Sequence, residues 1–144
     1  MHERNDADFH QRLVEELVAT LQERGFRILG ADNVAGWAPV HPLPNDGYGD
    51  QEAKTPDVFA YDQKNRCFII GEAKTGEGDL ETDHALTQYN VYLDQFDTRQ
   101  GTRATLYMIL PAAKVPEFNS LITHYLHPDY WKHIVVVTSQ ASVV

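Results

Sequence analysis

Two apolar segments of strand length follow each other closely in the middle of this chain. Val58–Tyr61 and Arg66–Ala73 are separated only by residues 62–65, which are turn-forming. Strands joined by so short a connection pair as an antiparallel hairpin. The sequence therefore predicts a β-hairpin, and the remaining elements must pack around it.

Helical and strand patterns lie on both sides of this hairpin. Apolar residues recur at helical spacing in residues 8–24 and 80–96, and a third helical segment, 115–126, ends before Pro128. Strands are predicted at residues 26–29, 103–110 and 133–138, the last rich in valine. The order α-β-β-β-α-β-α-β predicts an α/β fold, with a mixed central β-sheet flanked by α-helices.

Length and composition favour one domain. A chain of 144 residues, 42% of them hydrophobic, has material for one core, so we expect a single domain over residues 1–144. Residues 30–55 are rich in proline and glycine and lack periodicity, which predicts a long loop. Loops of this length inside a domain are usually functional or disordered.

The formal net charge of −9 disfavours a surface that grips nucleic acid unaided, because non-specific phosphate binding depends on clustered Lys and Arg. Residues 99–144 are the exception, with more basic than acidic side chains, so a bound polynucleotide would lie along that third. No apolar run approaches the ~20 residues that cross a bilayer. The single cysteine, Cys67, cannot form an internal disulfide. We expect a soluble, cytoplasmic protein without a membrane partner.

Two carboxylates and an ammonium group fall at neighbouring ends of the hairpin strands. Asp57 opens the first strand, and Glu72 and Lys74 close the second. Side chains alternate along a strand, so Glu72 and Lys74 point the same way, while the Ala73 carbonyl between them stays available as a ligand. Oxygen ligands of this kind suit Mg²⁺ or Mn²⁺. A plainer interpretation is a solvated salt bridge between Glu72 and Lys74, with Asp57 as an ordinary cap.

The same residues resemble the PD-(D/E)XK nuclease superfamily, which includes restriction endonucleases, Holliday-junction resolvases and RecB-like nucleases. The resemblance lies in Pro56-Asp57, in Glu72-Ala73-Lys74 and in Gln88-Tyr89-Asn90-Val91-Tyr92, which is similar to the QxxxY element of RecB-like members. It implies a restriction endonuclease-like core and metal-dependent hydrolysis of phosphodiester bonds, which we expect to be those of DNA. Asp57, Glu72 and the Ala73 carbonyl would then hold the metal, and Lys74 would orient water or stabilise charge on the phosphate.

Residues on the second predicted helix extend this candidate site. Gln88 lies one turn before Tyr92 and one turn after His84, so the three can line one edge of the helix. We expect Gln88 in the catalytic group and Tyr92 and His84 toward the substrate. The alternative is a partly buried helix flank with Tyr92 in the core.

The first predicted helix offers a further acid, which many members of the superfamily have there. Glu16 is our candidate metal ligand; Glu15 borders the other side of the apolar stripe, and two solvated glutamates are an equal alternative. His10 falls near the middle of the apolar face, which is typical of a hydrogen-bonded core histidine.

Other functions remain open from the sequence. A catalytically inactive relative could serve as a binding or scaffold module in a DNA repair, restriction or mobile-element complex, and the small size and acidic charge agree with reliance on partners. A nuclease of this kind could also act as a homodimer, since one centre cuts one strand. A glycosidase with two carboxylates would give Lys74 no role.

Overall fold

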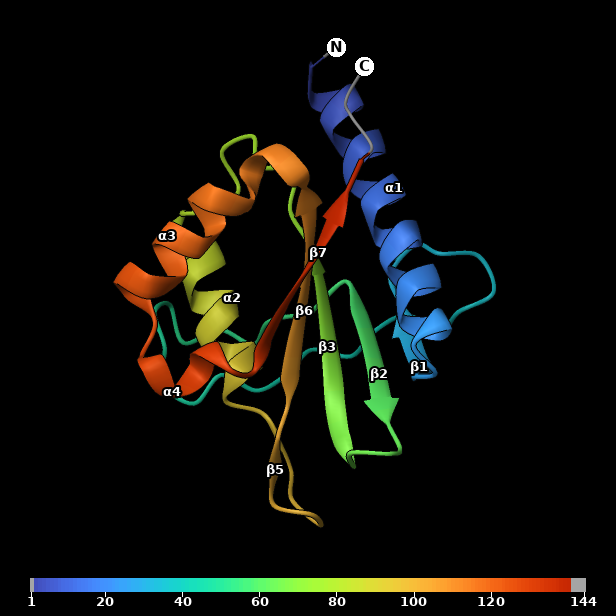
Figure 1. Cartoon of the computed structure of the whole chain (residues 1–144), viewed down its shortest axis with the longest axis vertical. Coiled ribbons are helices and arrows are strands. Elements are labelled where there is room, and N and C mark those ends of the chain that lie inside the picture. The colour runs from blue at the N-terminus through green and yellow to red at the C-terminus, as the bar shows by residue number, and fades with distance from the viewer. Residues whose placement is uncertain (1, 141–144) are drawn as a thin grey trace.

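The computed structural model describes residues 2–140, and side chains from residue 7 onward, around a five-stranded mixed sheet (Figure 1). In order across the sheet, the strands are β1 (Arg27–Ala31), β2 (Val58–Asp62), β3 (Cys67–Ala73), β6 (Thr105–Pro111) and β7 (Ile134–Ser139). The strands β1, β2 and β3 are antiparallel, and β3, β6 and β7 are parallel. The predicted hairpin and mixed sheet are thereby confirmed.

Helices cover both faces of the sheet. In Figure 1, α1 (His2–Glu23) lies on one side, and α2 (Asp83–Leu93), α3 (Val115–Tyr125) and α4 (Pro128–Trp131) lie on the other. Alternating strand residues feed the two resulting cores. Ile69 packs in the core under α1, whereas Ile70 packs in the core under α2 and α3. The direction of each β3 side chain therefore decides which helix layer it meets.

Several boundaries differ from the prediction. Helix α1 begins at His2 instead of residue 8 and ends before Gly25, whose positive φ of 85° suits a helix-ending glycine. Helix α2 begins at Asp83 instead of residue 80, because the Thr82 side chain accepts a hydrogen bond from the Ala85 amide and caps the helix there. The short elements β4 (Phe96–Asp97), β5 (Thr102–Arg103), η1 (Ala112–Lys114) and α4 were not predicted, since segments of two to four residues show no periodicity.

The predicted long loop is packed onto the domain. Within residues 32–57 the structure has one isolated antiparallel bridge, between Leu43 and Lys54. Trp37 packs against the core under α1, and Tyr48 packs against the core under α2. The bridge carries Lys54 into the interior, where only 3% of the residue is exposed.

Gly71 lies on β3 where Leu17 of α1 packs against the strand. A Cβ atom at this position would lie 2.9 Å from Leu17 Cδ2 and 3.0 Å from Val58 Cβ. Both neighbours are fully buried, so neither has free space to move into. The backbone φ of Gly71 is not positive, so its conformation does not require glycine. The close contacts of a Cβ atom are what require glycine at this position.

We expect Gly71→Ala to lower the free energy of unfolding by about 1–3 kcal/mol, the usual cost of overpacking a core. Urea denaturation measures this loss. If the clash with Leu17 is the cause, the double variant Leu17→Val/Gly71→Ala should lose less than the two single losses added together. Simple additivity would contradict this account of the crossing.

Candidate active site

Asp57 lies just before β2 and completes the hairpin ladder with its side chain. Val58 pairs with Gly71, so Pro56 falls opposite Ala73. Proline has no N–H, and the Ala73 carbonyl consequently receives no ladder hydrogen bond from Pro56. The Ala73 amide instead donates to Asp57 Oδ2 at 2.9 Å. This contact places the Asp57 carboxylate and the Ala73 carbonyl at the same strand end.

Glu72 and Lys74 project from β3 toward α2, on the same side of the strand as predicted. Lys74 Nζ lies 3.2 Å from Glu72 Oε2 and donates to Gln88 Oε1 at 2.8 Å. Glu72 is 4% exposed, and Lys74 and Gln88 are each 7% exposed. The structure thus brings Asp57, Glu72, Lys74 and Gln88 together. The ion pair is buried, which rules out the plainer interpretation of a solvated salt bridge.

The buried Glu72 carboxylate lacks enough positive charge around it. Among the described residues, its Oε1 atom has no hydrogen-bond partner. Burial and, after it, the nearby Asp57 charge raise the pKa of Glu72 to about 8, against the opposing effects of Lys74 and His10. One ammonium group therefore does not compensate the two carboxylates, and a further cation would be stabilised here.

The other two residues expected on α2 behave differently. Tyr92 is fully buried, so its side chain belongs to the core and reaches no surface that a substrate could touch. His84 is exposed, and its Nδ1 atom lies 3.3 Å from Lys54 Nζ. Desolvation and the charges of Lys54 and Lys74 lower the pKa of His84. Of this pair, only His84 stays accessible from solvent.

The first helix contributes a histidine to the site where an acid was expected. Glu16 Oε1 accepts a hydrogen bond from Ser139 Oγ at 2.7 Å, which ties α1 to β7. His10 Nε2, in contrast, lies 3.3 Å from Asp57 Oδ2, and the His10 side chain is 36% exposed. The hydrogen bond to Asp57 raises the pKa of His10, against the opposing effect of burial. The expected hydrogen-bonded histidine is present, but it is only partly buried and lies at the edge of the core, because α1 presents this edge of its apolar stripe to the strand end.

Two more contributors were missed from the sequence. Lys54 Nζ donates to Asp50 Oδ2 at 2.7 Å beside His84. No local sequence pattern predicts that a lysine in a loop is buried. Asp79 accepts hydrogen bonds from the Thr75 and Gly76 amides and from the Thr75 hydroxyl, which fixes the chain directly after Lys74. An aspartate shortly after a Thr-Gly pair is the signal that could have identified this turn.

The oxygen donors at this strand end are of the kind that a hard divalent cation takes as ligands. Within the described part of the chain, no three His, Cys, Asp or Glu side chains converge as metal ligands. Asp57 and Glu72 supply two carboxylates, the Ala73 carbonyl has no proline N–H to bind, and Glu72 Oε1 is buried without a partner. Mg²⁺ is commonly held by one or two carboxylates and keeps several waters. These residues could hold such an ion without a third acidic side chain.

Comparison with family models, with curated proteins and with solved structures finds no match to this chain. Over residues 2–140, none of the helices combines the length and the apolar character needed to span a membrane.

The raised pKa of Glu72 makes stability depend on pH. A carboxyl group whose folded pKa is raised gives its full stabilisation below the unfolded value of 4.5 and loses it as the pH rises through about 8. We therefore expect Glu72→Gln to be more stable than the metal-free wild type at pH 7–8, by about 1–3 kcal/mol, and the difference to shrink toward pH 4.5. Urea denaturation across this range, in chelator, measures the difference.

Glu15→Gln is the matched control, because Glu15 is exposed on α1. Its stability should follow the wild-type pH profile. A difference between Glu72→Gln and wild type that stays constant from pH 4.5 to 8 would show that the Glu72 carboxyl is not perturbed in this way.

Proposed function

We propose that this protein is a divalent-metal-dependent nuclease that hydrolyses phosphodiester bonds in DNA, built on a restriction endonuclease-like core. The observation that carries the proposal is the grouping of Asp57, Glu72, Lys74 and Gln88 at one strand end, with a buried Glu72 oxygen that has no partner among the described residues. The order of these residues along the chain, and their places on β2, β3 and α2, agree with the PD-(D/E)XK resemblance.

Each residue then has a distinct part in hydrolysis. Asp57, Glu72 and the Ala73 carbonyl would hold Mg²⁺ or Mn²⁺, which when bound neutralises phosphate charge and lowers the pKa of water. Gln88 and Glu72 hold the Lys74 ammonium in place, so that it is already oriented toward charge that develops on the phosphate. His10 is the accessible edge of the group, and the substrate would approach from its side.

Acting on both strands of a duplex would require two such centres. We infer a homodimer or a larger complex for double-strand cleavage, since each chain offers one strand-end cluster of this kind within its described residues. The overall charge of −9 also favours help from partners in binding DNA. Cytoplasmic nucleic acid is the proposed target.

A non-catalytic binding or scaffold module is the second candidate. The observation that favours it is the burial of the group: only 4% of Glu72 and 7% of Lys74 are exposed, and Lys74 already has two partners. In such a module the buried cluster would hold α2 against β3. Metal binding separates the two candidates, since a scaffold needs no ion.

We expect the purified protein to cleave DNA in Mg²⁺ or Mn²⁺ and to lose all cleavage in EDTA, because the ion supplies water activation and charge neutralisation. Linear, circular, branched and single-stranded DNA and RNA are the substrates to compare. Asp57→Asn should abolish cleavage, whereas Asp46→Asn, in the exposed part of the loop, should not. Cleavage that continues in EDTA, or in Asp57→Asn, would contradict the proposal.

Lys74 separates catalysis from a structural ion pair. Lys74→Met should lower kcat by about 10²-fold or more, while the Mn²⁺ binding isotherm changes little, because the ammonium acts on the transition state. Arg99→Met removes an exposed positive charge and is the control. A Lys74→Met protein that cuts at the wild-type rate would leave Lys74 with only a structural role.

A further inference from the structure

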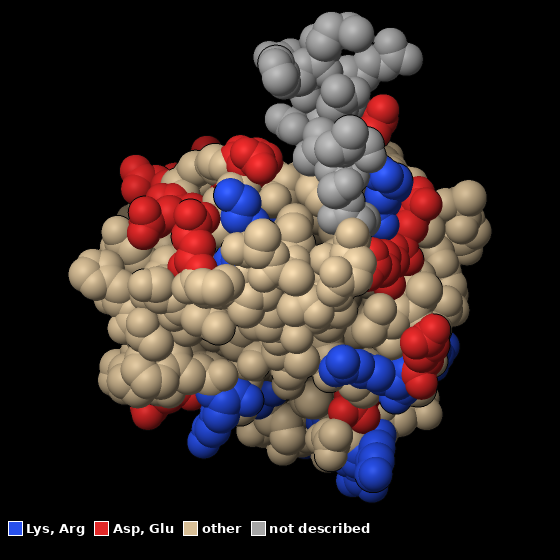
Figure 2. Space-filling view, turned by 45° about the horizontal axis from the view of Figure 1, so that its top comes forward, with Lys and Arg blue, Asp and Glu red and all other residues tan. Residues whose placement is uncertain are grey.

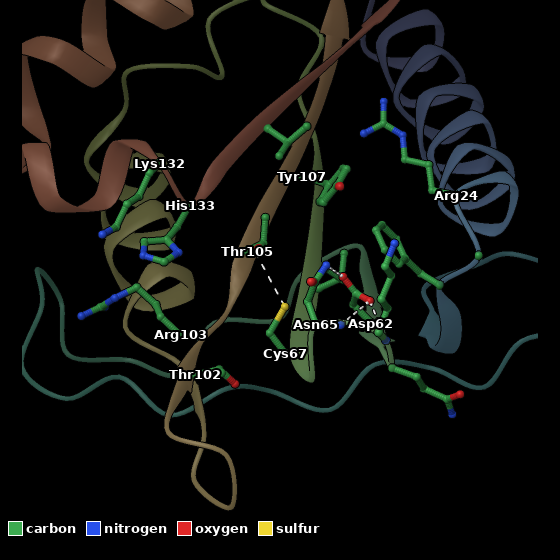
Figure 3. Close-up of a pocket in the computed structure, with 16 residues that line it drawn as sticks. Arg24, Asp62, Asn65, Cys67, Thr102, Arg103, Thr105, Tyr107, Lys132 and His133 are labelled. Carbon is green, nitrogen blue, oxygen red and sulfur yellow. Dashed lines mark hydrogen bonds between the residues drawn. The ribbon is translucent and has the colours of Figure 1, made fainter.

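A hollow lies at the opposite end of the sheet from the carboxylate site. It has a volume of about 860 Å³ and opens on the α1 face, and the strand residues Cys67, Ile69, Thr105 and Tyr107 form its floor. Figure 3 shows Cys67, Thr105 and Tyr107 of this floor. Cys67 begins β3 and Glu72 lies five residues further on, so the two sites are about 16 Å apart along the strand. Glu72 also points to the other face of the sheet. This pocket is therefore separate from the candidate active site.

The walls of the pocket are basic, although the chain as a whole is acidic. Arg24, Lys64, Arg103 and Lys132 line it together with His133. These are four of the twelve Lys and Arg side chains, in a chain with 21 acidic residues. Figure 2 shows several Lys and Arg side chains toward the lower edge of the molecule, with others higher up. This local excess of positive charge favours anions.

The acidic and ionisable groups at the pocket do not cancel this charge. Asp62 is the one carboxylate in the lining, and it accepts hydrogen bonds from the Lys64 and Asn65 amides and from Asn65 Nδ2. Burial raises the pKa of the Cys67 thiol, so the floor is neutral at pH 7. Burial and the charges of Arg103 and Lys132 lower the pKa of His133.

Two cations are held in position on opposite walls. The Arg24 guanidinium lies 5.3 Å from the centroid of the Tyr107 ring, which packs edge-on against Phe26. Across the floor, the Arg103 guanidinium stacks on Phe96 and Tyr130 at 4.5 and 4.9 Å. In Figure 3, Arg24 lies on the α1 side, and Arg103, Lys132 and His133 lie together on the other, with Thr105, Cys67 and Tyr107 between them.

Three of the four cations can bind phosphate without first breaking an ion pair. Among the described residues, Arg24, Lys64 and Lys132 make no salt bridge. Arg103 is already engaged, since it donates to the Leu93 carbonyl and lies 3.8 Å from Asp94. The volume of about 860 Å³ is larger than a single phosphate needs. A ligand that fills it would place an apolar part over the floor and anionic groups toward the walls.

We propose that this pocket binds a nucleotide, with its phosphate groups on the basic walls and its base or sugar over the floor formed by Ile69, Thr105 and Tyr107. The volume lies in the range of small-ligand pockets, about 300–1,000 Å³. Arginine and lysine supply charge-assisted hydrogen bonds to phosphate oxygens. The nucleotide is either free or part of a nucleic-acid strand, and the proposal does not depend on catalysis at Asp57 and Glu72.

Calorimetry in EDTA, which prevents metal-dependent cleavage, tests this pocket with three probes: ATP, 5′-phosphorylated hexathymidylate and inorganic pyrophosphate. Binding of ATP supports a free nucleotide, and binding of the hexamer alone supports a strand. Arg24→Gln/Lys132→Gln should weaken either by about tenfold or more, because each lost contact is charge-assisted. Both residues are exposed, so we expect the variant to fold.

Arg27→Gln/Arg99→Gln is the matched control, since it removes the same charge from exposed positions outside the pocket. Asp57→Asn should also bind the probes as the wild type does, which distinguishes this site from the nuclease centre. Absence of binding by ATP and by the hexamer would overturn the proposal. Equal weakening in both double variants, or pyrophosphate binding as tight as that of ATP, would overturn it as well.

Cys67 provides a readout that does not depend on any variant. It is the sole cysteine of the chain and forms part of the floor. With ligand at ten times its Kd, labelling of Cys67 by a thiol reagent should slow about tenfold, because only the free protein reacts. An unchanged labelling rate at saturating ligand would place the bound nucleotide elsewhere and contradict the proposal.

Discussion

The β2–β3 ladder ends where the Ala73 amide donates to the Asp57 carboxylate. Pro56, opposite Ala73, has no N–H to donate to the Ala73 carbonyl. The arrangement of the candidate site follows from this contact. It brings one carboxylate to the end of β3 and leaves the Ala73 carbonyl without a ladder donor from Pro56. The parallel pairing of β3 with β6 supports the other side, where the Lys74 amide donates to the Ile109 carbonyl.

Burial then sets the chemistry of the group. Helix α2 covers Glu72 and Lys74, and in this environment a carboxylate is costly unless it is well compensated. Lys74 is shared between Glu72 and Gln88, and Asp57 adds a second negative charge. The raised pKa of Glu72 expresses this deficit of positive charge. A divalent cation would remove the deficit, which gives the metal hypothesis a physical basis that is independent of any resemblance.

Local sequence patterns predicted the hairpin, because residues 62–65 allow only a tight connection, and strand alternation predicted that Glu72 and Lys74 share a face. Properties that depend on tertiary packing were not predicted. The burial of the Glu72–Lys74 pair requires α2 above it, and the choice of His10 over Glu16 depends on how α1 crosses the sheet. The basic pocket was also not predicted, since its walls come from the residues just after α1, the β2–β3 turn, β5 and the segment before β7. The one sequence feature that agrees with this pocket is the excess of basic over acidic residues in 99–144.

The central claim is that Asp57, Glu72 and the Ala73 carbonyl bind one divalent ion. A crystal grown with Mn²⁺ and measured at a wavelength where manganese scatters anomalously tests this directly. We expect one anomalous peak within about 2.0–2.4 Å of an oxygen from each of the three groups, typical of carboxylate and carbonyl ligands to such ions. A map without a peak at this strand end, and with Asp57 still bound to His10 and the Ala73 amide, would contradict the claim.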